Sequence, residues 1–204
     1  MGTPPSNGKL LYHITYIDNI SSILLEGLLS REMLRKYNVN DFTDIADPEI
    51  IGKRENYKNA LSKYVPFHFY AKNPFDGAVC KKYGSENMVI ITVSRDLHYR
   101  KDYEKKMFVI PSHPLDKDEP DFYLYEEGLK LVKWDILDNE DERDYHNSEI
   151  KKACMAECVI KHRVPPEDFA TIYVQNKNIE NKIKEMKKSA PIKIQVNPNM
   201  FPRS

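Results

Sequence analysis

Two polar side chains, His13 and Thr15, stand out in the first strand-like stretch of the sequence. The residues around them, from Leu10 to Tyr16, are otherwise apolar or aromatic, and an apolar helical segment follows. Because side chains two positions apart on a strand point to the same face, the imidazole and the hydroxyl would lie side by side. Together they can bind a ribose or an amide, or they can satisfy each other.

A single acid, Glu157, lies within the apolar run of residues 155–160. Strand alternation would place Met155, Glu157 and Val159 on one face of the sheet. A carboxylate in such a run either faces solvent on an edge strand or is held inside the protein for a chemical purpose, because an ionised group is costly to bury without a partner. The residues alone leave both interpretations open.

A basic pair and a histidine are further candidates for residues that contact a ligand. Lys53 and Arg54 adjoin on the helix that Pro48 is expected to begin, where such a pair is usually solvated surface. His113 lies in the turn Pro111–Pro114, which its prolines stiffen. It is either a surface histidine or an ordered contact to a ligand.

Aromatic side chains offer flat surfaces at two other places. Tyr64 and Phe67 belong to the strand expected over residues 64–69. Trp134 is the single tryptophan and the one large anchor in the acidic, weakly patterned stretch 133–149. Each ring can stack on a ligand ring or fill the core, since burial of an aromatic side chain is favourable in either setting.

Three segments, taken in order, resemble the DarT family of ADP-ribosyltransferase toxins: H-I-T-Y-I-D-N at residues 13–19, Y-V-P-F-H-F at residues 64–69, and A-E-C-V-I at residues 156–160. No single motif is specific, and the ordered set with its spacing carries the resemblance, which spans residues 10–194. Members of this family use NAD+ to modify bases in single-stranded DNA. The resemblance therefore implies an NAD+-dependent mono-ADP-ribosyltransferase with thymine as the expected target and guanine as the open alternative. It also implies a toxin with a macrodomain antitoxin as its partner.

The resemblance implies roles for the charged candidates. Glu157 would be the catalytic carboxylate, which hydrogen-bonds the ribose 2′-hydroxyl, stabilises the positive charge developing at C1′ and accepts the base proton. Arg54 is the preferred match to an arginine that holds the pyrophosphate or stabilises the base losing its proton. The interval to Tyr64 is shorter than expected of the family, so Lys53 stays open as the alternative.

The other candidates are divided between the two expected ligands. The residues assigned to NAD+ are His13, Thr15, Asn19, Arg54, Tyr64 and Phe67. The residues assigned to the acceptor base are His113 and Trp134. The family often has a histidine where this chain has Tyr16, which keeps an aromatic ring and removes a titratable group.

Composition limits the classes of partner. The chain has 204 residues with 31 basic and 31 acidic side chains, so it has no net charge to hold duplex DNA by backbone electrostatics. A local groove for a few nucleotides of single strand stays possible, because stacking supplies much of that affinity. The three cysteines form no C-x-x-C pair, and no metal is expected. Without a secretory segment or a membrane-spanning run of about 18 apolar residues, we expect a cytoplasmic monomer.

Strand-like and helical segments are mixed without regular alternation, which predicts an α+β fold. With the resemblance, this becomes an ADP-ribosyltransferase-like fold in which split antiparallel or mixed central sheets are flanked by helices. Residues 10–204 are expected to form one domain, preceded by a disordered or foreign segment over residues 1–9. Two other functions stay open: the same fold acting on protein or RNA, and a non-catalytic module that binds nucleotides or single-stranded DNA.

Overall fold

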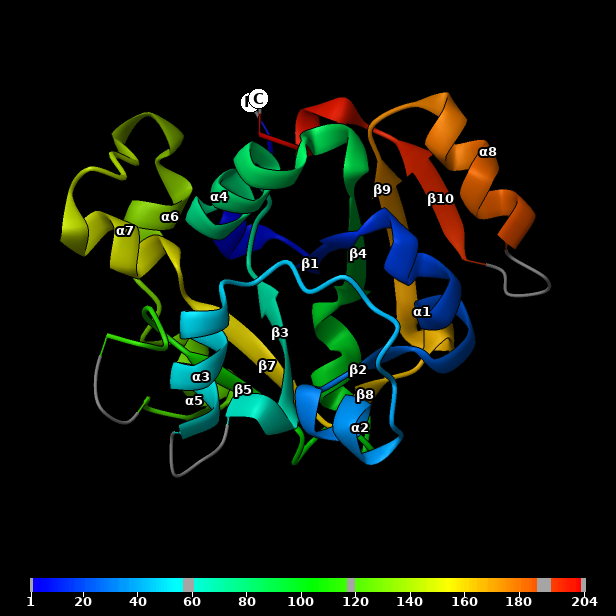
Figure 1. Cartoon of the computed structure of the whole chain (residues 1–204). Helices are drawn as coiled ribbons and strands as arrows, with labels where there is room; N and C mark the ends of the chain where they lie inside the picture. The colour runs from blue at the N-terminus through cyan, green and yellow to red at the C-terminus, as the bar shows by residue number, and fades with distance from the viewer. Residues whose placement is uncertain (1, 57–60, 117–119, 187–191, 203–204) are drawn as a thin grey trace.

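The computed structural model describes residues 2–56, 61–116, 120–186 and 192–202. Its centre is an eight-stranded sheet in the order β10-β9-β4-β1-β3-β7-β5-β6 (Figure 1). The β9–β10 pair is parallel, and the other pairs in this sheet are antiparallel. The strands are β1 (Leu10–Tyr16), β3 (Tyr64–His68), β4 (Met88–Ser94), β5 (Met107–Ile110), β6 (Tyr123–Leu124), β7 (Glu157–Lys161), β9 (Phe169–Val174) and β10 (Lys193–Val196).

The sheet is nearly divided between β1 and β3. β1 pairs with β4 along its whole length, from Leu10 opposite Ser94 to Tyr16 opposite Met88. Its pairing with β3 is confined to Tyr12 opposite His68. The two halves therefore diverge on either side of one bridge, and side chains from β1 and β3 both face the space between them. The expected α+β fold with a split mixed sheet and flanking helices is confirmed.

Helices cover the sheet, and local sequence signals fix several of their ends. In α4, the Asn73 side chain accepts hydrogen bonds from the backbone N–H groups of Phe75 and Asp76, Pro74 occupies the first turn, and Gly84 ends the helix. A two-stranded sheet of β2 (Leu28–Leu29) and β8 (Arg163–Val164) lies beside the larger one. The helices are α1 (Ile20–Glu26), α2 (Arg31–Lys36), α3 (Pro48–Asn56), α4 (Pro74–Tyr83), α5 (Tyr125–Leu129), α6 (Trp134–Asp138), α7 (Ser148–Cys154) and α8 (Lys177–Met186).

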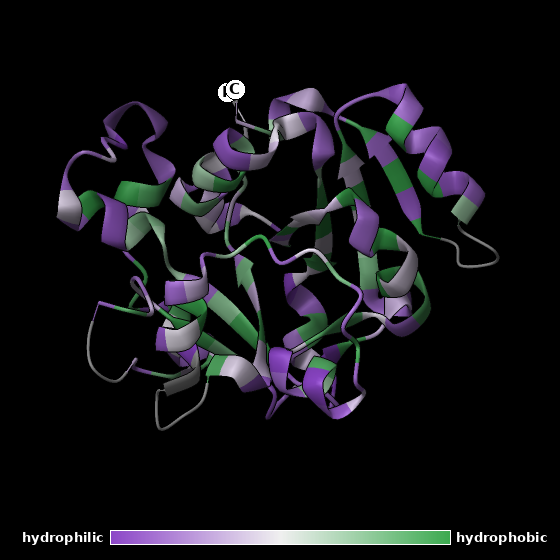
Figure 2. Ribbon diagram, viewed as in Figure 1, coloured by the Kyte–Doolittle hydropathy of each residue, from purple (hydrophilic) through white to green (hydrophobic). Residues whose placement is uncertain are grey.

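The core lies against both faces of the sheet. Residues 88–93 of β4 are all buried, as expected of a central strand with a continuous apolar run. In Figure 2 hydrophobic colour is concentrated on the strands, whereas α2 and α8 show largely hydrophilic outer surfaces. Cys80, Cys154 and Cys158 are buried and unpaired, so they serve as small apolar core residues.

Three further segments extend this framework. Near the start of the chain, Pro5 is buried, and both the backbone N–H and the hydroxyl of Ser6 bind the Asp138 carboxylate. Helix α5 begins at Tyr125, directly after β6. The acidic stretch 133–149 contains all of α6 and the start of α7, whose short apolar stripes are hidden among charges.

Gly27 ends α1 in a conformation reserved for glycine, with φ of 82° and an extended ψ. A Cβ at this position would lie 2.3 Å from the carbonyl oxygen of Val164. We expect Gly27→Ala to lower the free energy of unfolding by at least about 2 kcal/mol. Gly77→Ala in α4, where a Cβ would meet nothing within 4 Å, should raise it by roughly 0.5–1 kcal/mol. Urea denaturation measures both changes in stability. If Gly27→Ala were as stable as wild type, position 27 would tolerate a side chain without backbone strain.

Candidate active site

A cleft of about 280 Å³ opens where the two halves of the sheet diverge. Its walls come from elements far apart in the chain: β1, β3, the start of β7, helix α3, and the loop residues 113–115. The loop segment 42–46, between α2 and α3, closes one side and is called the strap below. Figure 1 shows this part of the chain crossing in front of β1 and β3.

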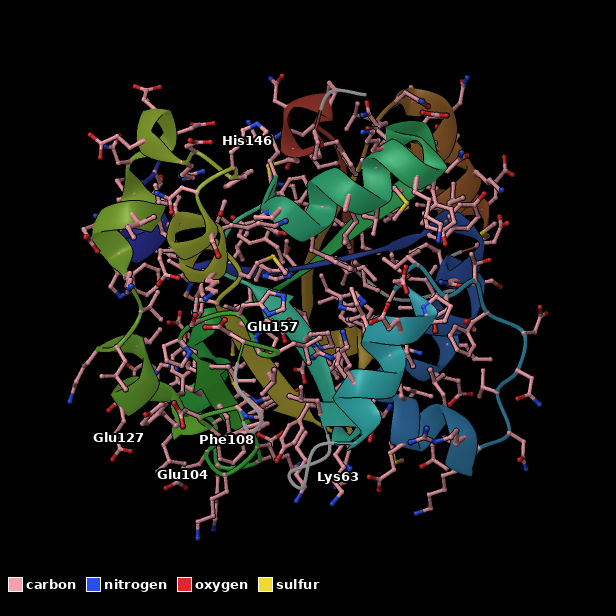
Figure 3. The ribbon with its side chains drawn as sticks, turned by 60° about the vertical axis from the view of Figure 1, so that its left-hand side comes forward. Lys63, Glu104, Phe108, Glu127, His146 and Glu157 are labelled. Carbon is pink, nitrogen blue, oxygen red and sulfur yellow. The ribbon has the colours of Figure 1, made fainter. Side chains whose placement is uncertain are left out.

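An ion pair between Arg54 and Glu157 joins the two walls. The guanidinium donates one hydrogen bond to each carboxylate oxygen, both at 3.0 Å. The side chains are 14% and 5% exposed, and such a buried bidentate pair is stronger and more directional than a surface ion pair. Figure 3 shows Glu157 inside the molecule, whereas Glu104 and Glu127 project outward. The structure thereby excludes the exposed edge-strand interpretation of Glu157.

Of the two basic candidates, Arg54 lines the cleft and Lys53 does not. Lys53 turns away from the cleft, is 58% exposed and reaches Glu49, one helical turn earlier, at 2.8 Å. Burial alone would raise the pKa of Glu157, but the adjacent charge and hydrogen bonds of Arg54 outweigh it and hold that pKa below its ordinary value. Glu157 is therefore ionised at neutral pH and Arg54 is the cation that faces it.

Three histidines line the cleft, and the hydrogen bonds at Nδ1 fix their tautomers. Nδ1 of His13 lies 2.8 Å from the carbonyl oxygen of Pro66, and Nδ1 of His68 lies 3.3 Å from that of Ala156. A carbonyl only accepts, so both rings carry the proton on Nδ1 and an unshared pair on Nε2. His113 is the reverse: its Nδ1 accepts from the backbone N–H of Leu115 at 3.1 Å, so its neutral ring has an N–H at Nε2.

Burial keeps these rings neutral. It lowers the pKa of His13 to about 4, and it is also the first cause of the lowered pKa values of His68 and His113. The charge of Glu157 opposes the shift at all three histidines without cancelling it. Around the Arg54–Glu157 pair, the cleft therefore presents two imidazole acceptors and one imidazole donor at neutral pH.

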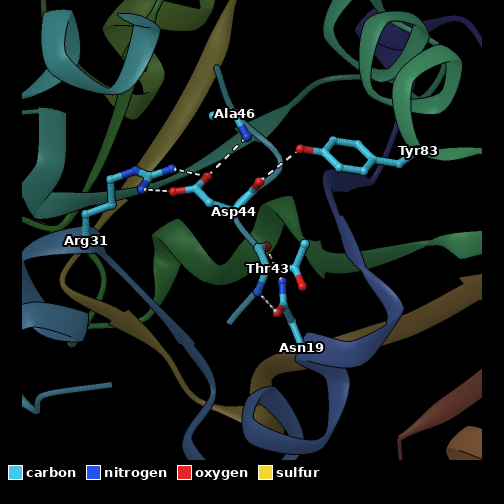
Figure 4. Close-up of polar contacts among 6 residues, drawn as sticks. All are labelled: Asn19, Arg31, Thr43, Asp44, Ala46 and Tyr83. Atoms are coloured by element: carbon cyan, nitrogen blue, oxygen red, sulfur yellow. Dashed lines mark hydrogen bonds and ion pairs between the residues drawn. The ribbon is translucent and has the colours of Figure 1, made fainter. Parts of the chain in front are cut away.

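Side-chain hydrogen bonds from Asn19, Arg31 and Tyr83 hold the strap over the cleft (Figure 4). The Asn19 side chain accepts from the backbone N–H of Thr43 at 2.7 Å and donates to its carbonyl at 2.9 Å, as a neighbouring strand would. Both terminal nitrogens of Arg31 donate hydrogen bonds to the Asp44 carboxylate, and Nη2 lies 2.7 Å from Oδ1. Tyr83 donates to the carbonyl oxygen of Asp44 at 3.2 Å. Contacts from the turn before α1, from α2 and from α4 thus converge on two consecutive strap residues.

We expect Asp44→Asn to loosen the strap, because a neutral amide cannot accept both guanidinium hydrogen bonds. Amide hydrogen exchange of residues 42–46 should accelerate about five- to tenfold, with a change below about 1 kcal/mol in global stability. Asp41→Asn is the matched control, since Asp41 is an exposed acid just before the strap. Identical exchange rates in Asp44→Asn and wild type would show that the Arg31–Asp44 ion pair does not hold the strap in place.

The structure brings most of the predicted site residues to this cleft. Thr15 and Asn19 both line it, and they also bond to each other, because the amide of Asn19 donates to the Thr15 hydroxyl at 3.2 Å. Tyr64 also lines the cleft, and its ring centroid lies 5.2 Å from that of Phe122. His113 reaches the cleft from its proline-bounded turn.

Two of the predicted contact residues, Phe67 and Trp134, lie outside the cleft lining. Phe67 points to the opposite face of β3 from Tyr64 and His68, is fully buried, and supports the His13 ring from within the core. Trp134 packs edge-on against Phe69 and donates its indole N–H to the carbonyl of Leu129, away from the cleft lining. In both cases core packing decided the orientation of a ring that the sequence could not assign to a side.

His68 is the cleft residue that sequence reasoning missed. It shares a face of β3 with Tyr64, so alternation within that strand was the available signal. Its importance depends on which strand lies next to β3, and that pairing is not encoded locally.

Comparison with known proteins identifies the family. A family model described as "ssDNA thymidine ADP-ribosyltransferase, DarT" matches residues 12–202. The chain belongs to the DarT family. A curated DarT relative is the DNA ADP-ribosyl transferase–DNA ADP-ribosyl glycohydrolase fusion protein of Thermosipho africanus, which is 25% identical over 198 residues. The match covers 94% of this chain and 49% of the relative, so the chain spans about half of that protein.

Two solved DarT structures share the fold. Thermosipho africanus DarTG in complex with ADP-ribose superposes with a TM-score of 0.79 at 22% identity, over 95% of this chain and 51% of that one. Thermus sp. 2.9 DarT in complex with ADP-ribosylated ssDNA gives a TM-score of 0.79 at 19% identity, over 95% of this chain and 96% of that one. The three ordered motifs at residues 13–19, 64–69 and 156–160 therefore predicted the family correctly.

The described part of the chain adds two negative findings. It contains no group of three or more His, Cys, Asp or Glu side chains arranged to hold a metal ion. None of its helices has the length and apolar character needed to cross a membrane.

Proposed function

We propose that this protein is an NAD+-dependent mono-ADP-ribosyltransferase that modifies thymine in single-stranded DNA. Membership of the DarT family supports the reaction class, and the structures of family members with NAD+ and with ADP-ribosylated ssDNA support the two substrates. The observation that carries the proposal in this chain is the buried Arg54–Glu157 pair, which fixes an ionised carboxylate in a cleft lined by polar groups.

Glu157 is the group that promotes cleavage of the glycosidic bond of NAD+. As that bond breaks, positive charge develops on C1′ of the nicotinamide ribose, and the buried carboxylate stabilises it. The two hydrogen bonds from Arg54 leave further lone pairs on the carboxylate oxygens, so Glu157 can also accept a hydrogen bond from the ribose 2′-hydroxyl.

Arg54 and the histidines orient the reactants. The unshared pair on Nε2 of His13 can accept a hydrogen bond from a ribose hydroxyl, and the Nε2–H of His113 can donate to a carbonyl oxygen of the base. Thymine carries a carbonyl on each side of its ring N–H, so one such donor helps to align that nitrogen with C1′. Arg54 offsets the negative charge that the base acquires as its proton leaves.

Partners and location follow from the same assignment. The Thermosipho relative joins the transferase to a DNA ADP-ribosyl glycohydrolase in one protein. We propose that this chain is a toxin with a macrodomain antitoxin of that activity as its partner, and that it acts as a monomer in the cytoplasm.

The proposed function is tested by incubating the protein with labelled NAD+ and equimolar single-stranded DNA, RNA or protein. Label is expected on single-stranded DNA, and digestion to nucleosides followed by mass spectrometry should locate it on thymidine. Label confined to protein or RNA would favour the alternative acceptor classes. No transfer to any pool, combined with retained binding of NAD+, would favour the non-catalytic module.

A further inference from the structure

His68 lies directly opposite the candidate catalytic acid. β3 and β7 are antiparallel, with His68 paired to Glu157, so the two side chains leave the same face of the sheet with Cβ atoms about 5 Å apart. His68 is 6% exposed and lines the cleft with Arg54 and His113. A buried imidazole beside a buried carboxylate in a binding cleft has more than a packing role available to it.

The ring of His68 is oriented from two sides. Its Nδ1–H donates to the carbonyl of Ala156 at 3.3 Å, and its face lies 6.1 Å from the ring of Phe75 between centroids. Nε2 therefore holds an unshared pair and makes no hydrogen bond to any residue in the described ranges. That nitrogen is available to a group bound in the cleft.

The reaction requires an acceptor for one proton. Arg54 already binds both oxygens of Glu157 and holds its pKa below the ordinary value. The same carboxylate must stay ionised to stabilise the charge at C1′. A second, neutral base in the cleft would separate the two tasks.

Building on the proposed function, we propose that His68 is a catalytic base that takes the acceptor-base proton through Nε2. The ring N–H bond of the base breaks, and its electron pair forms the new bond to C1′. The bond from C1′ to nicotinamide breaks, and its electron pair leaves on neutral nicotinamide. The proton forms an imidazolium on His68 beside the Glu157 carboxylate and then passes to water.

The charges around His68 support this role. Burial, Arg54 and His113 lower the pKa of His68, and His13 is a further neighbouring histidine in the same cleft. Glu157 and the Ala156 carbonyl act in the opposite direction, although the pKa stays below its ordinary value. His68 is thus neutral before the reaction, and Glu157 stabilises the cation once it forms.

The test compares His68→Gln with wild type in transfer to a thymidine-containing oligonucleotide. An amide keeps a donor for the Ala156 carbonyl and cannot act as a base. We expect kcat to fall about 100-fold, the KM for NAD+ to change less than about threefold, and the fall of activity below pH 6.5 to flatten. His98→Gln is the matched control, since His98 also binds a backbone carbonyl, that of Arg95 at 2.6 Å, and lies outside the cleft lining.

Two outcomes overturn the proposal separately from the proposed function. An active wild type with His68→Gln within about threefold of it in kcat and with an unaltered pH profile would show that His68 is not the base. In the wild-type protein, ring nitrogen NMR should show His68 unprotonated at Nε2 at neutral pH, and a proton at that atom would also overturn it. A wild type that transfers nothing to DNA would instead overturn the proposed function, and this assignment with it.

Discussion

Replacing Glu157 by glutamine should lower the rate of ADP-ribosyl transfer by about 10⁴-fold, equivalent to roughly 5.5 kcal/mol of transition-state stabilisation. The amide has the shape of the carboxylate and can accept a hydrogen bond from the ribose hydroxyl. It carries no charge to offset the positive charge at C1′, and in a buried site that charge is the larger contribution. Initial rates at saturating NAD+ and oligonucleotide measure the effect.

The same substitution leaves Arg54 as a buried cation without its anion. We expect a loss of about 1–3 kcal/mol in the free energy of unfolding, which denaturation reports independently of activity. Glu127→Gln is the matched control, because Glu127 is exposed and projects away from the cleft (Figure 3). A folded Glu157→Gln protein that keeps more than about a tenth of the wild-type rate would contradict a catalytic role for Glu157.

Helices and strands are easiest to predict where a short segment contains the residues that begin and end it. Asn73, Pro74 and Gly84 bound α4, and the continuous apolar run of residues 88–93 is typical of a strand buried on both faces, as β4 is. The ordered motifs also gave the family, since they preserve the order of strands and acids that the fold requires.

Predictions depending on distant pairing were less complete. Arg54 and Glu157 are 103 positions apart, so only the fold or the resemblance could join them. His68 acquires its place opposite Glu157 from the pairing of β3 with β7, which no residue near either strand encodes. Trp134 shows the converse, because a large ring in a charged stretch suggested a ligand contact and instead anchors α6 to the core.

Replacing Arg54 by methionine tests the other half of the ion pair. Without the guanidinium, burial is the main influence on Glu157 and raises its pKa. In wild type the lowered pKa keeps Glu157 ionised, so protonation of Glu157 itself reduces activity only as pH falls through that low value. In Arg54→Met the acid limb of the pH–rate profile should move to higher pH, and the rate at pH 7 should fall about 10³-fold.

Only part of the lost rate should return as the pH is raised, because ionisation of Glu157 is restored while the positive charge that offsets the negative charge on the deprotonated base is not. Lys53→Met is the control that the helix itself provides: Lys53 is the preceding residue, is exposed and pairs with Glu49, so its removal should leave both rate and profile unchanged. If Lys53→Met were instead the more damaging change, the active-site cation would be Lys53, and the ion pair with Glu157 would not persist in the working enzyme.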